Sequence, residues 1–136
     1  MQIKFEWTPD ISVGNEEIDD QHKKLLNKIN ELLEAIFNEK EKEVIGDTIS
    51  FLGQYIKNHL VYEENYMKEN MYPDLMGHQE IHQNFVDKYE EFETRFRENG
   101  TSDNMLHEVE AFLGDWWVRH IAIEDKKYFI FINENK

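Results

Sequence analysis

The chain has 136 residues, no cysteine and a formal charge of −14, and this length suits one domain with its own core. The missing cysteines exclude a disulfide framework, thiolate nucleophiles, zinc–cysteine sites and iron–sulfur clusters. The negative charge argues against nucleic acid or an anionic membrane as a partner. Residues 1–10 lack the apolar core of a secretory signal, and no apolar run approaches the length of a membrane helix, so we expect a cytoplasmic protein.

The chain begins with an expected extended arm, residues 1–14, in which Thr8-Pro9 disfavours helix. Four segments follow in which apolar residues recur at helical spacing, with charged residues between them. We expect these helices at about Ile18–Phe37, Val44–Met67, Leu75–Phe96 and Leu106–Ile123. Asn99-Gly100 is a good signal for the end of the third helix. The pattern does not decide between helix and extended chain for the tail, residues 126–136.

Short connections between these helices make sequential helices antiparallel neighbours. We therefore predict an all-α fold: an antiparallel, up-down-up-down four-helix bundle with an N-terminal extended arm and a short C-terminal segment. Residues 1–136 form a single domain in this prediction. The sequence shows no internal repeat, linker or low-complexity segment.

Histidines occupy positions of the apolar stripes on all four predicted helices. Residues four apart share a helix face, as do His78 and His82, and likewise His59 and Glu63. With alternating helix directions, five histidines fall at the same end of the bundle: His22, His59, His78, His82 and His120. Buried imidazoles can simply be satisfied by hydrogen bonds, but five in one small bundle favour a metal centre that binds neutral nitrogens and carboxylates. Five imidazoles exceed the needs of one zinc ion and suit a pair of first-row ions.

This set resembles the hemerythrin family, and within it the single-domain bacteriohemerythrins. The resemblance rests on His22, His59-x3-Glu63, His78-x3-His82 and His120-x4-Asp125. It also includes Trp7 with Ser12-Val13-Gly14-Asn15, Asp20-Gln21-His22-Lys23, Tyr72-Pro73, Trp117-Val118-Arg119-His120-Ile121 and Asp125-Lys126-Lys127-Tyr128. One departure is Trp116-Trp117-Val118, where the family often has one tryptophan followed by leucine.

The resemblance implies two iron ions (Fe²⁺/Fe³⁺) with an oxo or hydroxo bridge. His78, His82 and His120 would hold one ion, His22 and His59 the other, and Glu63 and Asp125 would bridge them. Dioxygen would bind at the two-histidine ion, for oxygen storage, delivery or scavenging and not as an enzyme, with an oxygen-consuming enzyme as a possible acceptor. Residues within about a turn of these ligands are candidate walls of an oxygen pocket, or ordinary core: Leu26, Ile29, Ile56, Trp116 and Ile121.

Three alternative functions fit the sequence less well. A ferritin-like oxidase or ferroxidase uses Glu-x-x-His pairs, and no histidine here follows a glutamate at that spacing. A zinc hydrolase of the HExxH type places its glutamate directly after the first histidine, whereas Glu80 is two residues after His78. An oxygen or redox sensor would act through a separate partner.

Helical spacing and the family resemblance point to different residues of the acidic pair Glu124-Asp125. A regular helix would place Glu124 about 40° from His120 around the axis and Asp125 about 140° away. The resemblance points to Asp125 as the bridging ligand. We therefore predict irregular backbone between Ile121 and Lys126, such as a π-type bulge, with Glu124 facing solvent.

Overall fold

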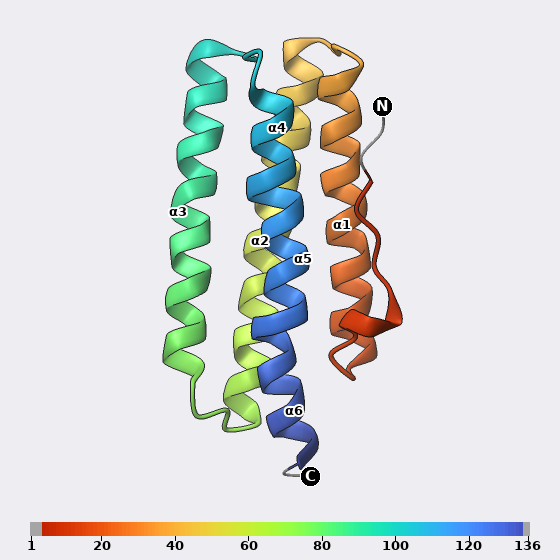
Figure 1. Ribbon diagram of the computed structural model, residues 1–136. Coiled ribbons are helices and arrows are strands. Elements are labelled where there is room, and N and C mark those ends of the chain that lie inside the picture. The colour runs from red at the N-terminus through yellow and green to blue at the C-terminus, as the bar shows by residue number, and fades with distance from the viewer. Residues whose placement is uncertain (1–3, 135–136) are drawn as a thin grey trace.

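The computed structural model describes residues 4–134. Residues 1–3 of the predicted arm and 135–136 of the tail lie outside the described residues. The structure has three long helices, α1 (Glu16–Phe37), α2 (Lys42–Glu69) and α3 (Leu75–Asn99). A fourth helical rod follows them and consists of five consecutive segments: α4 (Met105–Val109), η2 (Glu110–Asp115), α5 (Trp116–Arg119), η3 (His120–Asp125) and α6 (Lys126–Glu134). Figure 1 shows α1, α2, α3 and this fourth rod alternating in direction. The predicted all-α, up-down-up-down bundle is confirmed.

Local sequence signals set several helix ends. The side chain of Asn15 accepts a hydrogen bond from the backbone N–H of Ile18 at 3.0 Å, which caps the start of α1. Gly100 ends α3 with a φ of 71° and donates its backbone N–H to Phe96 at 2.7 Å. This left-handed backbone favours glycine because glycine has no Cβ. The predicted Asn99-Gly100 stop is therefore the end of the helix.

The described part of the N-terminal arm, residues 4–14, runs beside α1 (Figure 1), and hydrogen bonds with the side chains of Asn30 and Asp19 hold it there. Asn30 accepts a hydrogen bond from Phe5 N at 2.8 Å and donates one to Phe5 O at 2.7 Å. The Phe5 ring packs against Gly114 of the fourth rod. Residues 4–14 of the arm are extended as predicted, except for one 3-10 turn, η1 (Pro9–Ile11).

The buried apolar residues form two clusters along the bundle. The larger one includes Leu25, Leu52, Phe85 and Leu113. The smaller one lies toward the C-terminal end of the fourth rod and includes Val13, Ile18, Met67, Tyr128 and Ile132. Along each long helix, the buried histidines and acids come between residues of these two clusters. A polar layer therefore interrupts the core near one end of the bundle.

The fourth rod extends the predicted fourth helix. The tail whose conformation the sequence left open is helix, α6, and continues the rod to Glu134. Two segments of the rod are π-helical, η2 and η3. The sequence predicts irregular backbone at η3 but does not predict the π-helical turn at η2.

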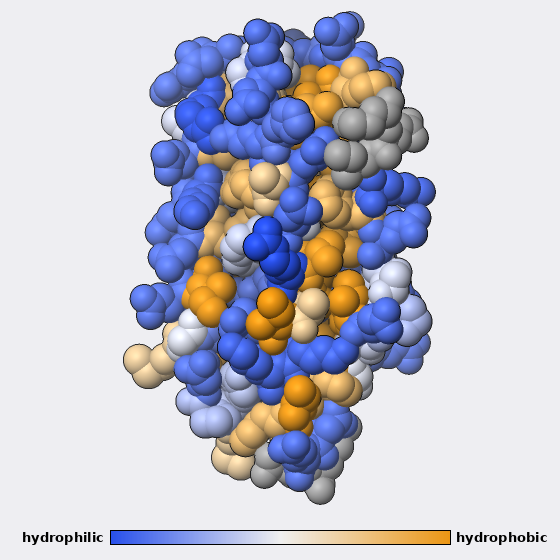
Figure 2. Space-filling view, in the orientation of Figure 1, coloured by the Kyte–Doolittle hydropathy of each residue, from blue (hydrophilic) through white to orange (hydrophobic). Residues whose placement is uncertain are grey.

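The surface carries most of the charged residues. In Figure 2, hydrophilic side chains cover much of the visible face, and apolar side chains form smaller patches between them. No helix within residues 4–134 is both long and apolar enough to cross a membrane.

Candidate metal centre

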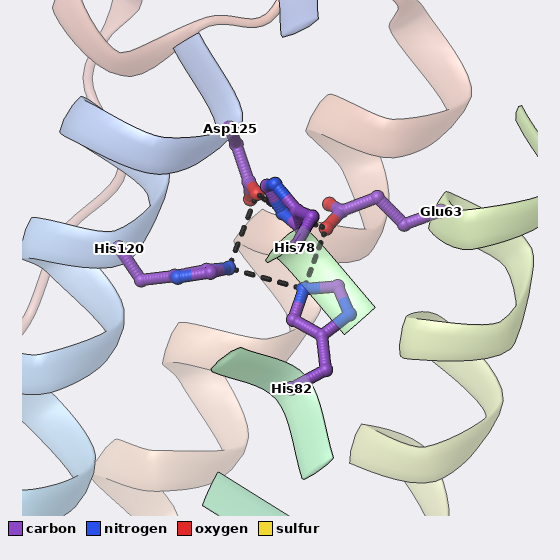
Figure 3. Close-up of side chains that lie close together, drawn as sticks. All are labelled: Glu63, His78, His82, His120 and Asp125. Atoms are coloured by element: carbon purple, nitrogen blue, oxygen red, sulfur yellow. Dashed lines mark hydrogen bonds and ion pairs between the residues drawn. The ribbon is translucent and has the colours of Figure 1, made fainter. Parts of the chain in front are cut away.

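Five imidazoles and two carboxylates meet in the polar layer of the bundle, each contributed by one of the four helical rods. The converging side chains are the seven predicted from the sequence: His22, His59, Glu63, His78, His82, His120 and Asp125. All seven are buried, with exposed fractions of 4% or less. Figure 3 shows five of them pointing toward one another.

The two oxygens of Glu63 face different histidines. Oε2 lies 3.2 Å from His22 Nε2 and 3.3 Å from His59 Nε2. Oε1 lies 3.6 Å from His78 Nε2 and 3.3 Å from His82 Nε2. One carboxylate therefore separates a two-histidine group from a group that belongs to α3.

Asp125 repeats this division from the opposite side. Its Oδ1 lies 2.9 Å from His78 Nε2 and 3.2 Å from His120 Nε2. Its Oδ2 lies 3.3 Å from His22 Nε2. The Nε2 atoms of His82 and His120 are 3.2 Å apart. The seven side chains thus form a three-histidine half and a two-histidine half, with both carboxylates between them.

The π-helical segment η3 places Asp125 in this cluster. It spans His120–Asp125, and a π turn brings residues five apart onto one side of the helix. Glu124 is partly exposed and pairs with Lys127, whose Nζ lies 3.2 Å from its Oε1. The predicted irregular backbone is confirmed, and of the two acids only Asp125 faces the histidines.

The buried charges shift the pKa values of the imidazoles in different directions. Burial lowers the pKa of His22 and of His78, but the hydrogen bonds and charges of Asp125 and Glu63 outweigh it and raise both pKa values to about 9. Burial lowers the pKa of His59, and the charge of Glu63 offsets this only in part. At neutral pH the metal-free cluster therefore holds protons on His22 and His78.

The same contacts keep the two carboxyl groups ionised. Burial raises the pKa of Glu63, but the surrounding imidazoles outweigh this effect and hold it well below its usual range. Burial and the charge of Glu63 raise the pKa of Asp125. The contacts with His120 and His22 lower this pKa by more, so that the net shift is downward. Two buried anions therefore face five imidazoles, and no lysine or arginine within residues 4–134 forms an ion pair with either anion.

Several atoms in the cluster lack a partner of their own. His59 Nε2, Glu63 Oε1 and Asp125 Oδ2 are buried, and none has a partner in hydrogen-bonding geometry within residues 4–134. Unsatisfied buried polar atoms are rare because each costs about 1–3 kcal/mol. Imidazole nitrogens and carboxylate oxygens are the donors that first-row transition metals accept. The donor set therefore fits two metal ions, one in each half.

Three side chains outside the predicted ligand set also contact this cluster. Tyr128 is buried, and its hydroxyl donates a hydrogen bond to Glu63 Oε2 at 3.3 Å. Gln21 and Glu64 contact the outer nitrogens of His59 and His82, at 2.7 and 2.8 Å. No sequence spacing marks these residues, because each of the three contacts joins two different helices.

The five residues predicted as walls of an oxygen pocket belong to the larger apolar cluster or pack against it. Leu26, Ile29, Ile56 and Ile121 are buried in the larger apolar cluster, and Trp116 is partly buried against it. Trp116 lies parallel to the His120 ring, with centroids 4.6 Å apart, and lines a surface hollow of about 290 Å³.

The other tryptophan of the pair is the inner one. Trp117, which the wall prediction left out, is fully buried, and its ring lies edge-on to His59 and His120, at 5.9 and 5.6 Å between centroids. The two neighbouring tryptophans therefore cover His120 on different sides.

Comparisons with known proteins agree with this geometry. Bacteriohemerythrin from Clostridium acetobutylicum is 31% identical over 127 residues, covering 91% of this chain and 98% of that protein. Myohemerythrin from Theromyzon tessulatum is 27% identical, covering 91% and 90%. A crystal structure of a hemerythrin mutant superposes with a TM-score of 0.84 at 26% identity, covering 94% and 95%. A family model described as the hemerythrin HHE cation binding domain matches residues 13–132, and the chain therefore belongs to the hemerythrin family.

Proposed function

We propose that this chain binds dioxygen reversibly at a di-iron centre in the polar layer of the bundle. The observation that carries the proposal is the division of each carboxylate: one oxygen faces the two-histidine half and the other faces the three-histidine half. A carboxylate in that position is placed to bridge two ions. The names of the curated relatives, bacteriohemerythrin and myohemerythrin, point to the same function.

The proposed ligands follow from the two halves. His78, His82 and His120 would hold one iron, and His22 and His59 the other, with Glu63 and Asp125 shared as bridges. When bound, the two irons supply the reversible electron exchange that dioxygen binding requires. The ion held by His22 and His59 would have fewer protein ligands than the other, which would leave room for a small molecule.

The rest of the chain would keep water and outside reductants away from this centre. Leu26, Ile29, Ile56 and Ile121 are buried beside the cluster. Trp117 covers the imidazoles of His59 and His120. The hydrogen bond from Tyr128 fixes the orientation of Glu63. A dry, apolar surrounding is the feature that favours release of intact dioxygen over its reduction by external donors.

Ligand chemistry also favours reversible binding over oxygen activation. The cluster has five imidazoles and two carboxylates, whereas ferritin-like oxidases use mostly glutamates. Fewer anionic donors stabilise high-valent iron less. Storage, delivery or scavenging of oxygen, without catalysis, is therefore the proposed role, and a separate oxygen-consuming enzyme as acceptor stays a prediction.

Spectroscopy of iron-loaded protein tests this function. We expect about two irons per chain and a visible absorption band that appears in air and disappears under inert gas. A spectrum that oxygen leaves unchanged, or steady consumption of oxygen by the protein with a reductant, would contradict reversible binding.

Variants of single histidines test the ligand assignment. His59→Ala should lower the iron content and abolish the reversible band, because His59 is one of only two imidazoles in its half. His107→Ala is the matched control, since the His107 side chain is 82% exposed and pairs only with Glu110 among the described residues. Full iron content and oxygen binding in His59→Ala would remove that residue from the site.

A further inference from the structure

Two of the five imidazoles have a polar side chain on their outer nitrogen. His82 Nδ1 lies 2.8 Å from Glu64 Oε2, and His59 Nδ1 lies 2.7 Å from Gln21 Oε1. Because each acceptor is an oxygen, both Nδ1 atoms carry the proton, which leaves each Nε2 lone pair free to face the centre. The two contacts lie in different halves of the cluster.

The two acceptors differ in charge. Glu64 is a carboxylate beside Glu63 on α2, and its side chain is 25% exposed at the edge of the cluster. Gln21 is a neutral amide, and its Nε2 donates to Glu17 at 3.1 Å, which turns its oxygen toward His59. An imidazole whose N–H is donated to a carboxylate becomes a stronger metal ligand than one that donates to an amide. The three-histidine half therefore contains the more electron-rich imidazole.

We propose that Glu64 is a positioning residue that makes the two metal ions electronically unequal. Through His82 it strengthens ligation in the three-histidine half and favours the ferric state there. Gln21 orients His59 without adding charge, so the two-histidine ion stays the weaker electron donor. This inference rests on the ligand assignment proposed above.

The test compares two variants that each remove one negative charge, Glu64→Gln and Glu80→Gln. Glu64→Gln keeps a hydrogen-bond acceptor near His82 but removes its charge. Glu80→Gln removes one charge from the same helix as His82, at an exposed position, and controls for long-range effects. Loss of an outer carboxylate typically weakens metal binding 10–100-fold.

In the iron-loaded protein the readout is the reduction potential. We expect Glu64→Gln to raise one of the two one-electron potentials, because about a tenfold change in the ratio of ferric to ferrous affinity corresponds to about 59 mV. Glu80→Gln should leave both potentials near those of the wild type. Equal shifts in the two variants would overturn the proposal.

A second readout needs no iron. Zinc titration of the metal-free chain should show at least about a tenfold weaker step for Glu64→Gln and no change for Glu80→Gln. Nitrogen NMR should show His82 of the wild-type metal-free chain with its proton on Nδ1. If the wild type takes up no iron, the proposed function fails, while zinc binding and the tautomer still decide the role of Glu64. Unchanged zinc affinity in Glu64→Gln, or a His82 imidazole that carries its proton on Nε2 and none on Nδ1, would overturn the inference.

Discussion

Asp125→Asn is the most direct test of the cluster, since asparagine has nearly the same shape but no charge. The Asp125 carboxylate lies 2.9, 3.2 and 3.3 Å from the Nε2 atoms of His78, His120 and His22. Removing one partner of a buried ion pair costs about 3–5 kcal/mol, because the other charge is left uncompensated. We expect the metal-free variant to lose about that much unfolding free energy at pH 7, from a total of about 5–15 kcal/mol for a typical domain.

Glu124→Gln is the matched control, one residue away in the same segment. Glu124 is 27% exposed and pairs with Lys127, which is 55% exposed, and such a pair contributes about 0–1 kcal/mol. Urea unfolding of the metal-free variants gives the free energies, and elemental analysis gives iron per chain after loading. Asp125→Asn should bind less iron than the wild type and Glu124→Gln the same amount. If the two variants exchanged these results, a regular helix with Glu124 on the metal would describe the site better.

Three further results are expected. Metal binding at pH 7.5 should release about two protons per chain, because imidazoles bind metal unprotonated and the pKa values of His22 and His78 are about 9 without metal. Calorimetry in buffers of different ionisation enthalpy measures the number of protons released. Because these folded-state pKa values exceed the ordinary 6.5, the stabilisation from the two protonated imidazoles is complete below about pH 6.5 and is lost as pH rises through 9. Urea unfolding of the metal-free chain should show a loss on the order of 3 kcal/mol for each of the two groups over this range, and a smaller loss with metal bound. Gly114→Ala should lower the unfolding free energy by about 1–3 kcal/mol, because a Cβ there would collide with the Phe5 ring, whereas equal stability would mean that the arm moves aside without cost.

Much of the fold and of the histidine–carboxylate cluster was predictable, because helical periodicity determines which residues of each helix face the interior. Residues four apart share a face whatever the tertiary structure, so His78 and His82 had to point the same way. The alternation of helix direction then brought histidines from different helices to one level. The number of buried imidazoles, and not any single spacing, favoured a metal site over ordinary packing.

The side chains around the cluster were not predictable in the same way. Glu64 directly follows Glu63 and lies about 100° further around α2, so the same periodicity that places Glu63 inside turns Glu64 toward α3. Its contact with His82 depends on the distance between the two helices, which no pattern within one helix encodes. Gln21 contacts His59 and Tyr128 contacts Glu63 across helices in the same manner. Such contacts require the packed structure.

The π-helical segment η3 shows how one extra residue reconciles two competing helix faces. In a regular helix, the face of His120 continues through Glu124, Lys127 and Phe131, and the face of Ile121 continues through Asp125, Tyr128 and Ile132. These faces lie about 100° apart. The cluster requires His120 from the first face and Asp125 from the second.

Widening one turn brings the two residues together, and it also decides which face of α6 is buried. Tyr128 and Ile132 follow Asp125 into the interior, with exposed fractions of 0% and 5%, while Lys127 pairs with Glu124 outside. The hydrogen bond from Tyr128 to Glu63 therefore depends on the same inserted residue that delivers Asp125. A deletion that restored a regular helix here would remove an acid from the cluster and a supporting hydroxyl in one step. The position of Asp125 and the buried face of α6 therefore depend on the same irregular turn.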